Sequence, residues 1–139
     1  MKTKKKSVVF ISRLFYPHIG GIEKHLMKLS IELIKRGYLI TIITSLYDKN
    51  LKINEEYKGI KILRIPIWKT KYFGLLKIWV NLVKLIKLFN NSDIVHIHDV
   101  FIWYWPLKIL LPMKKVYLTI HGQWGNYPIS LNDKLQKKI

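Results

Sequence analysis

Cysteine is absent from the 139 residues of this chain, and Asp and Glu together number only eight. The lack of cysteine excludes a disulfide-stapled scaffold and a thiol nucleophile. Long hydrophobic runs are missing too, because no uncharged apolar stretch approaches the roughly 18 residues of a membrane-spanning helix. The apolar run at residues 8–11 is too short for a secretory signal, and no small-residue cleavage site follows it. We therefore expect a cytoplasmic protein, with peripheral contact at the inner face of a membrane as a further option.

Arginine is also scarce, because only three of the 25 basic residues are Arg and the formal net charge of +17 is almost wholly lysine. Arg forks are the usual means of gripping phosphates and bases bidentately. No platform of aromatic and Arg side chains is recognisable, so we expect no nucleic-acid partner. Ile is as frequent as Lys, at 22 each, which is what A/T-rich coding would produce. Codon bias and a functional anionic partner are therefore equal explanations of the charge.

Apolar content is what the chain does have, since half of its residues are hydrophobic. Disordered basic tails combine high charge with low hydrophobicity, so this composition predicts a folded domain. The length suits one ordinary domain and is too short for a two-domain enzyme.

Short apolar runs alternate with segments of helical periodicity. Ile or Leu recurs at helical spacing from residue 22 to residue 33, and Gly37 follows where a helix would stop. The predicted strands are residues 7–12, 39–45, 60–67, 93–98 and 116–121, and the predicted helices are residues 22–36, 74–89 and 101–111. We expect an interruption of the last helix near Pro106 and a long surface loop over residues 46–59. Residues 122–139 show no periodicity that predicts an element.

Strands that alternate with helices predict an α/β fold with a Rossmann-like, mostly parallel sheet and helices on both faces. In such sheets ligands bind beyond the carboxyl ends of the strands. Three predicted strands are followed at that end by residues able to contact a ligand. These are Gly20 and Gly21 after the first strand, His98 and Asp99 after the fourth, and His121 and Gly122 after the fifth.

The two glycines belong to the run PHIGGIE, residues 17–23, ahead of the first predicted helix. Paired glycines let the backbone approach a phosphate or carboxylate, and the free N–H groups and dipole of the helix favour that anion. A plain tight turn explains the same residues equally well. Neither the Gly-Lys-Ser/Thr of a P-loop nor the Gly-x-Gly-x-x-Gly of a dinucleotide site is there.

Histidine marks the other two positions, in the runs DIVHIHD (93–99) and LTIHG (118–122). Strand alternation places His96 and His98 on one face, and we expect His96 in the core and His98 with Asp99 toward the ligand cleft. No metal is expected, because the remaining histidines lack ligand spacing, and no cofactor is expected. His121 could donate a hydrogen bond to a sugar hydroxyl or a carbonyl, and a purely structural histidine is the alternative. No Gly-x-Ser-x-Gly elbow accompanies it.

In their order, these runs resemble the N-terminal domain of GT-B glycosyltransferases of the retaining family 4 type. The resemblance covers residues 8–125 and rests on Pro17-x-x-Gly20-Gly21-x-Glu23, the helix with Leu29 and Leu33, Lys35-Arg36-Gly37, LITIIT, DIVHIHD and TIHG. It implies that Gly20 and Gly21 lie against the diphosphate of a nucleotide sugar or against the acceptor. It also implies that His121 is the active-site histidine near the transferred sugar.

The resemblance further implies transfer of a hexose-type sugar, with retention, from a nucleotide diphosphate sugar to a glycan or lipid-linked acceptor. Family members carry a second, donor-binding domain, and nothing after His121 can supply it. We therefore expect residues 1–139 to be the acceptor-side part of a truncated N-terminal domain, inactive by itself. The alternative is a non-catalytic acceptor-binding or membrane-docking subunit that pairs with a separate donor-binding chain. The carboxylate pair of a glycoside hydrolase is not evident.

Two apolar segments leave alternatives open. The predicted helix 74–89 has a narrow lysine and asparagine stripe and a broad apolar face, so it could lie in an anionic lipid interface. Packing of that face on the sheet is the favoured alternative. The run FIWYW, residues 101–105, is expected first as a core or interdomain cluster and second as a platform for the acceptor.

Overall fold

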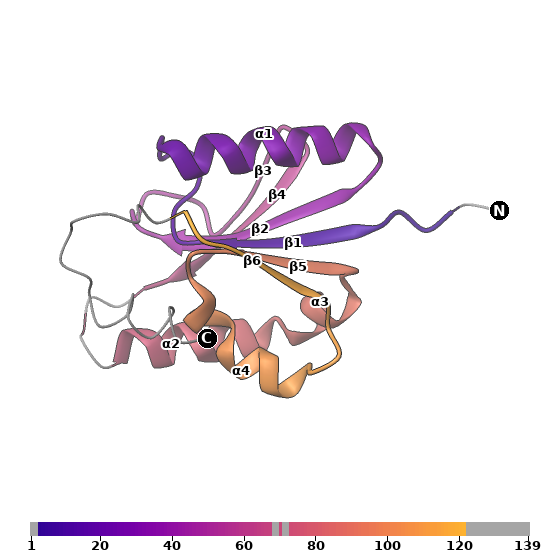
Figure 1. Cartoon of the computed structure of the whole chain (residues 1–139). Coiled ribbons are helices and arrows are strands. Elements are labelled where there is room, and N and C mark those ends of the chain that lie inside the picture. The colour runs from indigo at the N-terminus through magenta and orange to yellow at the C-terminus, as the bar shows by residue number, and fades with distance from the viewer. Residues whose placement is uncertain (1–2, 68–69, 71–72, 122–139) are drawn as a thin grey trace.

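The computed structural model describes residues 3–67, 70 and 73–121, which form a six-stranded sheet between two helical layers (Figure 1). The strand order is β3-β4-β2-β1-β5-β6, and only the β3–β4 pair is antiparallel. The strands are β1 (Ser7–Ser12), β2 (Leu39–Leu46), β3 (Asn54–Tyr57), β4 (Ile60–Pro66), β5 (Ile94–His98) and β6 (Val116–Thr119). The predicted α/β, Rossmann-like fold class is confirmed.

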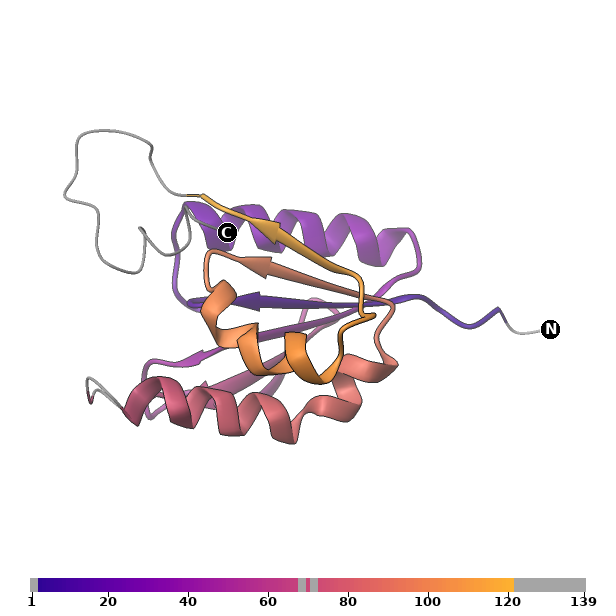
Figure 2. The same ribbon diagram turned by 60° about the horizontal axis from the view of Figure 1, so that its bottom comes forward.

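The helices divide unequally between the two faces of the sheet. Helix α1 (Gly21–Lys35) lies alone on one face. The other face carries α2 (Phe73–Lys84), α3 (Ile86–Asn91) and α4 (Phe101–Leu110), as Figure 2 shows from a second side. Parallel strands that are covered on both faces must be apolar on both sides, which explains the continuous apolar runs of β1 and β2.

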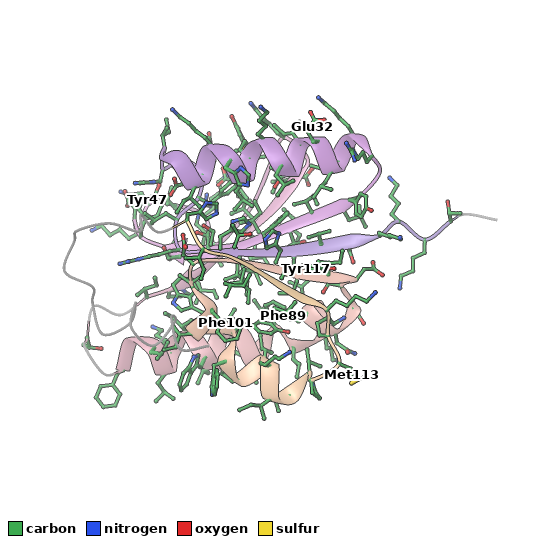
Figure 3. All side chains as sticks on the ribbon, viewed as in Figure 1. Glu32, Tyr47, Phe89, Phe101, Met113 and Tyr117 are labelled. Atoms are coloured by element: carbon green, nitrogen blue, oxygen red, sulfur yellow. The ribbon has the colours of Figure 1, made fainter. Side chains whose placement is uncertain are left out.

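Because side chains alternate along a strand, those of β1 pack into two separate cores on the two faces of the sheet. Val8 and Phe10 pack toward α1, where Leu26 joins them, whereas Val9 and Ile11 pack toward the opposite layer. Figure 3 shows one member of that second core, Phe89, between the sheet and the helices. The helices contribute to the second core Ile78, Leu82, Phe89, Trp103, Tyr104 and Leu107.

Helix α1 ends where the glycine of the sequence predicts. Gly37 has a φ of 86°, in the left-handed region that glycine adopts without strain. The Gly37 N–H donates to the Ile34 carbonyl at 2.9 Å, and the Tyr38 N–H donates to the Leu33 carbonyl at 3.0 Å. These two bonds satisfy carbonyls that a helix end leaves without partners. The chain then turns into β2, which pairs with β1.

The segment 46–59 contains strand β3, so the prediction of a long loop was wrong. Arg64 of β4 explains how this polar strand is held, because its side chain is fully buried. The guanidinium donates to the Lys52 carbonyl and to the Glu55 carboxylate, both at 2.7 Å, and to the Tyr16 carbonyl at 2.6 Å. A buried charge requires such partners. Periodicity does not reveal β3, since a buried ion pair and ladder bonds hold it rather than an apolar face.

The helix predicted over residues 74–89 is two helices, with the break at Leu85. The Leu85 N–H donates to the Leu82 carbonyl at 3.0 Å, a tighter turn than that of an α-helix. No Pro or Gly marks the break, and apolar residues continue through it, so the sequence pattern does not show it. Ile78, Leu82 and Phe89 are buried against the sheet, which confirms the favoured packing of this face.

Helix α4 runs through Pro106, so the predicted interruption was wrong. Proline has no N–H to donate to the carbonyl of Ile102, one turn earlier. The indole of Trp79 in α2 donates to that carbonyl instead, at 2.8 Å. The substitute donor satisfies the orphaned carbonyl and ties α2 to α4.

The run FIWYW begins α4 and is largely a core element, as first expected. Trp103 and Tyr104 are buried, and Trp105 is exposed on the outer side of the helix. Burial raises the pKa of the Tyr104 hydroxyl to about 12. Strand β6 ends at Thr119, two residues earlier than predicted, so His121 follows the strand rather than ending it.

Candidate functional site

Four of the five histidines meet on the α1 side of the sheet, near the carboxyl ends of β5 and β6. This histidine cluster comprises His25 from α1, His96 and His98 from β5, and His121 just beyond β6. The rings of His96, His98 and His121 form a stack, and His25 meets His121 edge-on. Ring centroids are 4.5 Å apart for His96 and His98, 5.1 Å for His98 and His121, and 5.5 Å for His25 and His121. The prediction that His96 and His98 share a face is confirmed.

Hydrogen bonds fix the cluster internally. His98 Nδ1 lies 2.8 Å from His121 Nε2, and His96 Nε2 lies 2.7 Å from the Thr119 hydroxyl. His98 is 1% exposed, whereas His96 is partly exposed. The relative burial is therefore the reverse of what the sequence predicted. The reason is that His121 follows the neighbouring strand and stacks over His98, so that His121 is the outer ring.

Burial sets the protonation of the two strand histidines. Burial, with smaller contributions from the neighbouring imidazoles, lowers the pKa of His98 to about 3. The pKa of His96 is lowered for the same reasons. Both rings are therefore neutral at pH 7. The two strand histidines therefore add no positive charge to this part of the site.

Asp99 joins the end of β5 to the end of β6. Its φ is 62°, in the left-handed region that Asp tolerates better than most residues. The Asp99 N–H donates to the Thr119 carbonyl at 3.0 Å, and its carboxylate accepts the backbone N–H of His121 at 2.6 Å. The predicted site residue thus lies at the expected edge, where it holds the backbone that carries His121.

The paired glycines start α1. Gly20 is the N-cap residue and Gly21 the first helical residue, and no side chain caps this helix end. A Cβ at Gly20 would collide with the carboxylate of Glu23, which also lies 3.2 Å from Nδ1 of His18. A Cβ at Gly21 would meet no atom within 4 Å. At Gly20 the Glu23 side chain would have to move to admit a Cβ, whereas at Gly21 nothing within 4 Å stands in the way.

The glycines and His121 belong to the same edge of the molecule. His25 lies about one helical turn after Gly21, and its ring contacts both His98 and His121. The start of α1 and the ends of β5 and β6 are thereby brought together, as the predicted carboxyl-edge site requires. Gly122 lies outside the described residues. Within the described ranges, no group of three or more His, Asp or Glu side chains is arranged to hold a metal ion.

A sequence model of a known protein family matches residues 19–139 and is described as Glycosyltransferase Family 4. The chain belongs to glycosyltransferase family 4. The match includes Gly20, Gly21, His98, Asp99 and His121. The family assigned from the sequence runs is confirmed.

Named relatives of this family 4 chain include two eukaryotic proteins. A subunit of the human phosphatidylinositol N-acetylglucosaminyltransferase is 33% identical over 66 residues, which cover 48% of this chain and 14% of the relative. The GPI3 subunit of that transferase from Saccharomyces cerevisiae (strain YJM789) is 28% identical over 95 residues, which cover 66% of this chain and 21% of the relative. The chain therefore spans about a fifth or less of the length of these relatives.

A solved structure supports the fold assignment. Sucrose-phosphate synthase from Thermosynechococcus elongatus, a GT-B glycosyltransferase, superposes with a TM-score of 0.56 at 16% identity. The match covers 84% of this chain and 32% of the other. The fold is that of the N-terminal half of a GT-B glycosyltransferase.

Sequence reasoning missed three contributors to the site. By sequence alone His25 is only one of the histidines that lack ligand spacing, although its position four residues after Gly21 places it one turn into the same helix. Thr119 is an ordinary strand residue whose contact with His96 depends on β6 lying beside β5. The contact of Glu23 with Gly20 and His18 follows from the path of the loop and has no sequence signal of its own.

Proposed function

We propose that the chain is the acceptor-side part of a glycosyltransferase that moves a sugar from a nucleotide diphosphate sugar to a glycan or lipid-linked acceptor, with retention. The meeting of the start of α1 with His121 at one edge of the sheet carries this proposal. The domain assignment, in which the donor-binding domain lies outside residues 1–139, remains a prediction. Membership of family 4 supports the reaction class.

The chemistry of the proposed reaction follows from where charge develops. Departure of the nucleotide leaves negative charge on its diphosphate, and free N–H groups at a helix start stabilise such charge. Gly20, the N-cap residue, and Gly21, the first residue of α1, would offer these groups. His121 would donate a hydrogen bond to the sugar. The neutral His98 beneath it carries no positive charge that would draw the diphosphate away from the start of α1.

The names of the relatives suggest the substrates for a first test. Both are named for transfer of N-acetylglucosamine to phosphatidylinositol, a phosphorylated lipid. We propose a donor and acceptor of this chemical class. The assay would incubate the chain together with its donor-binding part, supplied in the same polypeptide or as a co-purifying subunit, with UDP-N-acetylglucosamine and phosphatidylinositol vesicles. It would follow labelled sugar in the lipid.

The decisive variant is His121→Ala. Removing one hydrogen-bond donor from a reacting centre costs about 100-fold or more in turnover, and we expect a loss of that size. Ile120→Ala, which truncates the exposed neighbour, is the matched control and should keep most of the activity. Unchanged turnover by His121→Ala, or a product of inverted anomeric configuration, would refute the proposal.

A second candidate function is that of a non-catalytic subunit that binds the acceptor or the membrane. The relatives are themselves named as subunits, which supports this alternative. Co-purification of the chain with a separate donor-binding chain would favour it. Sugar transfer by the chain alone would exclude it.

We also propose that the layer of α2, α3 and α4 contacts an anionic bilayer. Large apolar side chains on its outer side are exposed, and Met113, beyond α4, is 93% exposed (Figure 3). Lys84, Lys87 and Lys108 are exposed in the same layer and complement anionic lipid headgroups. None of the described helices combines the length and apolarity needed to cross a bilayer. The exposed apolar residues of α2 and α4 are Phe73, Leu76, Val80, Trp105, Ile109 and Leu110.

A further inference from the structure

The contact between His98 and His121 constrains which nitrogen of His121 carries a proton. A neutral imidazole has one N–H donor and one bare nitrogen that accepts. At 2.8 Å, His98 Nδ1 and His121 Nε2 form a hydrogen bond, so one of these two nitrogens donates and the other accepts. The protonation of the inner ring therefore dictates that of the outer ring.

The other nitrogen of His98 decides between the two arrangements. His98 Nε2 is buried and has no hydrogen-bond partner among the described residues. If Nδ1 accepted, Nε2 would carry a buried N–H without an acceptor, and such orphaned N–H groups are rarer in proteins than unsatisfied acceptors. If Nδ1 donates, Nε2 is a bare nitrogen. The second arrangement is therefore the more stable one. A doubly protonated ring is excluded near neutral pH, because burial lowers the pKa of His98 to about 3.

We propose that His98 is a positioning residue that donates from Nδ1 to Nε2 of His121 and thereby fixes the proton of His121 on Nδ1. With Nε2 occupied as an acceptor, His121 meets its substrate as a hydrogen-bond donor and has no free basic nitrogen. His121 then holds a hydroxyl or carbonyl oxygen of the sugar in place and does not remove a proton. The catalytic meaning of this tautomer rests on the proposed function, but the tautomer itself does not.

The surroundings prevent the pair from rearranging. His96 stacks on His98 from the other side, and its own Nε2 is engaged by the Thr119 hydroxyl. Asp99 accepts the backbone N–H of His121 at 2.6 Å, which fixes the backbone from which the outer ring projects. Contacts on two sides therefore hold both rings. Such support is needed where a side chain must present one defined hydrogen-bond donor to its substrate.

The direct test is nitrogen NMR of the full chain labelled with ¹⁵N at histidine, in the neutral pH range. We expect His121 to show a protonated, pyrrole-type Nδ1 and an unprotonated, pyridine-type Nε2, and His98 to show the same pattern. In His98→Leu the proton of His121 should redistribute toward Nε2. A wild-type spectrum with the proton on Nε2 of His121, or an unchanged tautomer in folded His98→Leu, would overturn the inference. The wild-type spectrum decides the tautomer even if no variant folds.

Transfer activity provides a second readout. His98→Leu should lower kcat at least about tenfold, yet well short of the roughly 10⁴-fold that a wrong tautomer costs a histidine acting as general base. His98→Asn retains an N–H near the position of Nδ1 and should recover most of kcat, and Ile120→Ala, outside the histidine cluster, is the control. Equal losses in His98→Leu and His98→Asn would overturn the positioning role. If the chain together with its donor-binding part transfers no sugar, while the proton lies on Nδ1 of His121, the proposed function is refuted and this inference still stands.

Discussion

A side chain at Gly20 and one at Gly21 would have different surroundings. At Gly20 the carboxylate of Glu23 occupies the space, whereas at Gly21 a Cβ would meet open space. We predict that Gly21→Ala keeps or raises the melting temperature, because Ala favours a helix over Gly by up to about 1 kcal/mol. The same variant should raise KM for the nucleotide sugar or the acceptor several-fold, because a methyl group would stand where the ligand approaches the backbone. Thermal unfolding and steady-state kinetics measure the two effects.

Gly20→Ala is the matched comparison for this prediction. Its methyl group displaces the flexible Glu23 side chain, so a change in stability should accompany any change in KM. If Gly21→Ala leaves KM unchanged, the plain tight turn explains the glycine pair and no ligand approaches Gly21.

His98 also makes stability depend on pH. Folding lowers its pKa from 6.5 to about 3, so between these values the unfolded chain binds more protons than the folded one. The free energy of unfolding contributed by this group is complete above pH 6.5 and is lost as pH falls. The slope approaches about 1.4 kcal/mol per pH unit for one proton. Urea unfolding of wild type and His98→Asn between pH 7 and about 5 should give a steeper decline in the wild type, and parallel declines would contradict the prediction.

At the scale of elements, α2 and α4 share a hydrophobic core and are also joined by a side-chain hydrogen bond. The Trp79 indole donates to the Ile102 carbonyl, which Pro106 leaves without its helical donor. We predict that Trp79→Phe lowers the free energy of unfolding by about 1 kcal/mol or more, because the carbonyl loses its partner. Denaturant unfolding measures this loss.

A double-mutant cycle separates this effect from lost packing. In Pro106→Ala the new N–H can donate to the Ile102 carbonyl, so Trp79→Phe should cost less in that background. An equal cost in both backgrounds would show that the ring, and not its N–H, stabilises the helix pair.

For the whole molecule, the question is whether the net charge of +17 promotes membrane binding through one face or is spread over the surface without such a role. Lys87 and Lys108 are exposed on the layer opposite α1, and Lys24 and Lys28 are exposed on α1 itself. We predict that Lys87→Glu with Lys108→Glu weakens binding to phosphatidylinositol-containing vesicles about tenfold or more, because each lysine near an anionic surface contributes about 1 kcal/mol. Vesicle co-sedimentation measures this binding.

Lys24→Glu with Lys28→Glu changes the net charge equally and is the matched control. It should leave most of the vesicle binding, because these residues lie on the opposite side of the sheet (Figure 1). Equal losses in the two double variants would mean that the charge is diffuse, as codon bias alone would produce.

Whether an element could be predicted from the sequence depends on the interactions that hold it. Elements with an apolar face or a glycine stop, such as α1 with Gly37, are predicted to within a residue or two. Strand β3 is missed, because a buried Arg64 and ladder bonds hold it rather than periodic burial. A single long-range hydrogen bond from Trp79 likewise keeps α4 continuous at Pro106.

By itself, the sequence determined the α/β class and the family. It also determined the edge of the sheet at which Gly20, Gly21, Asp99 and His121 lie, because periodicity and order along the chain show which residues follow which strands. Tertiary structure alone decided that His98 lies beneath His121 and bonds to it. It also decided that His25 of α1 joins them. The reason is that such contacts depend on the pairing of β5 with β6 and the seating of α1 on the sheet, which bring together residues 23 to 96 positions apart.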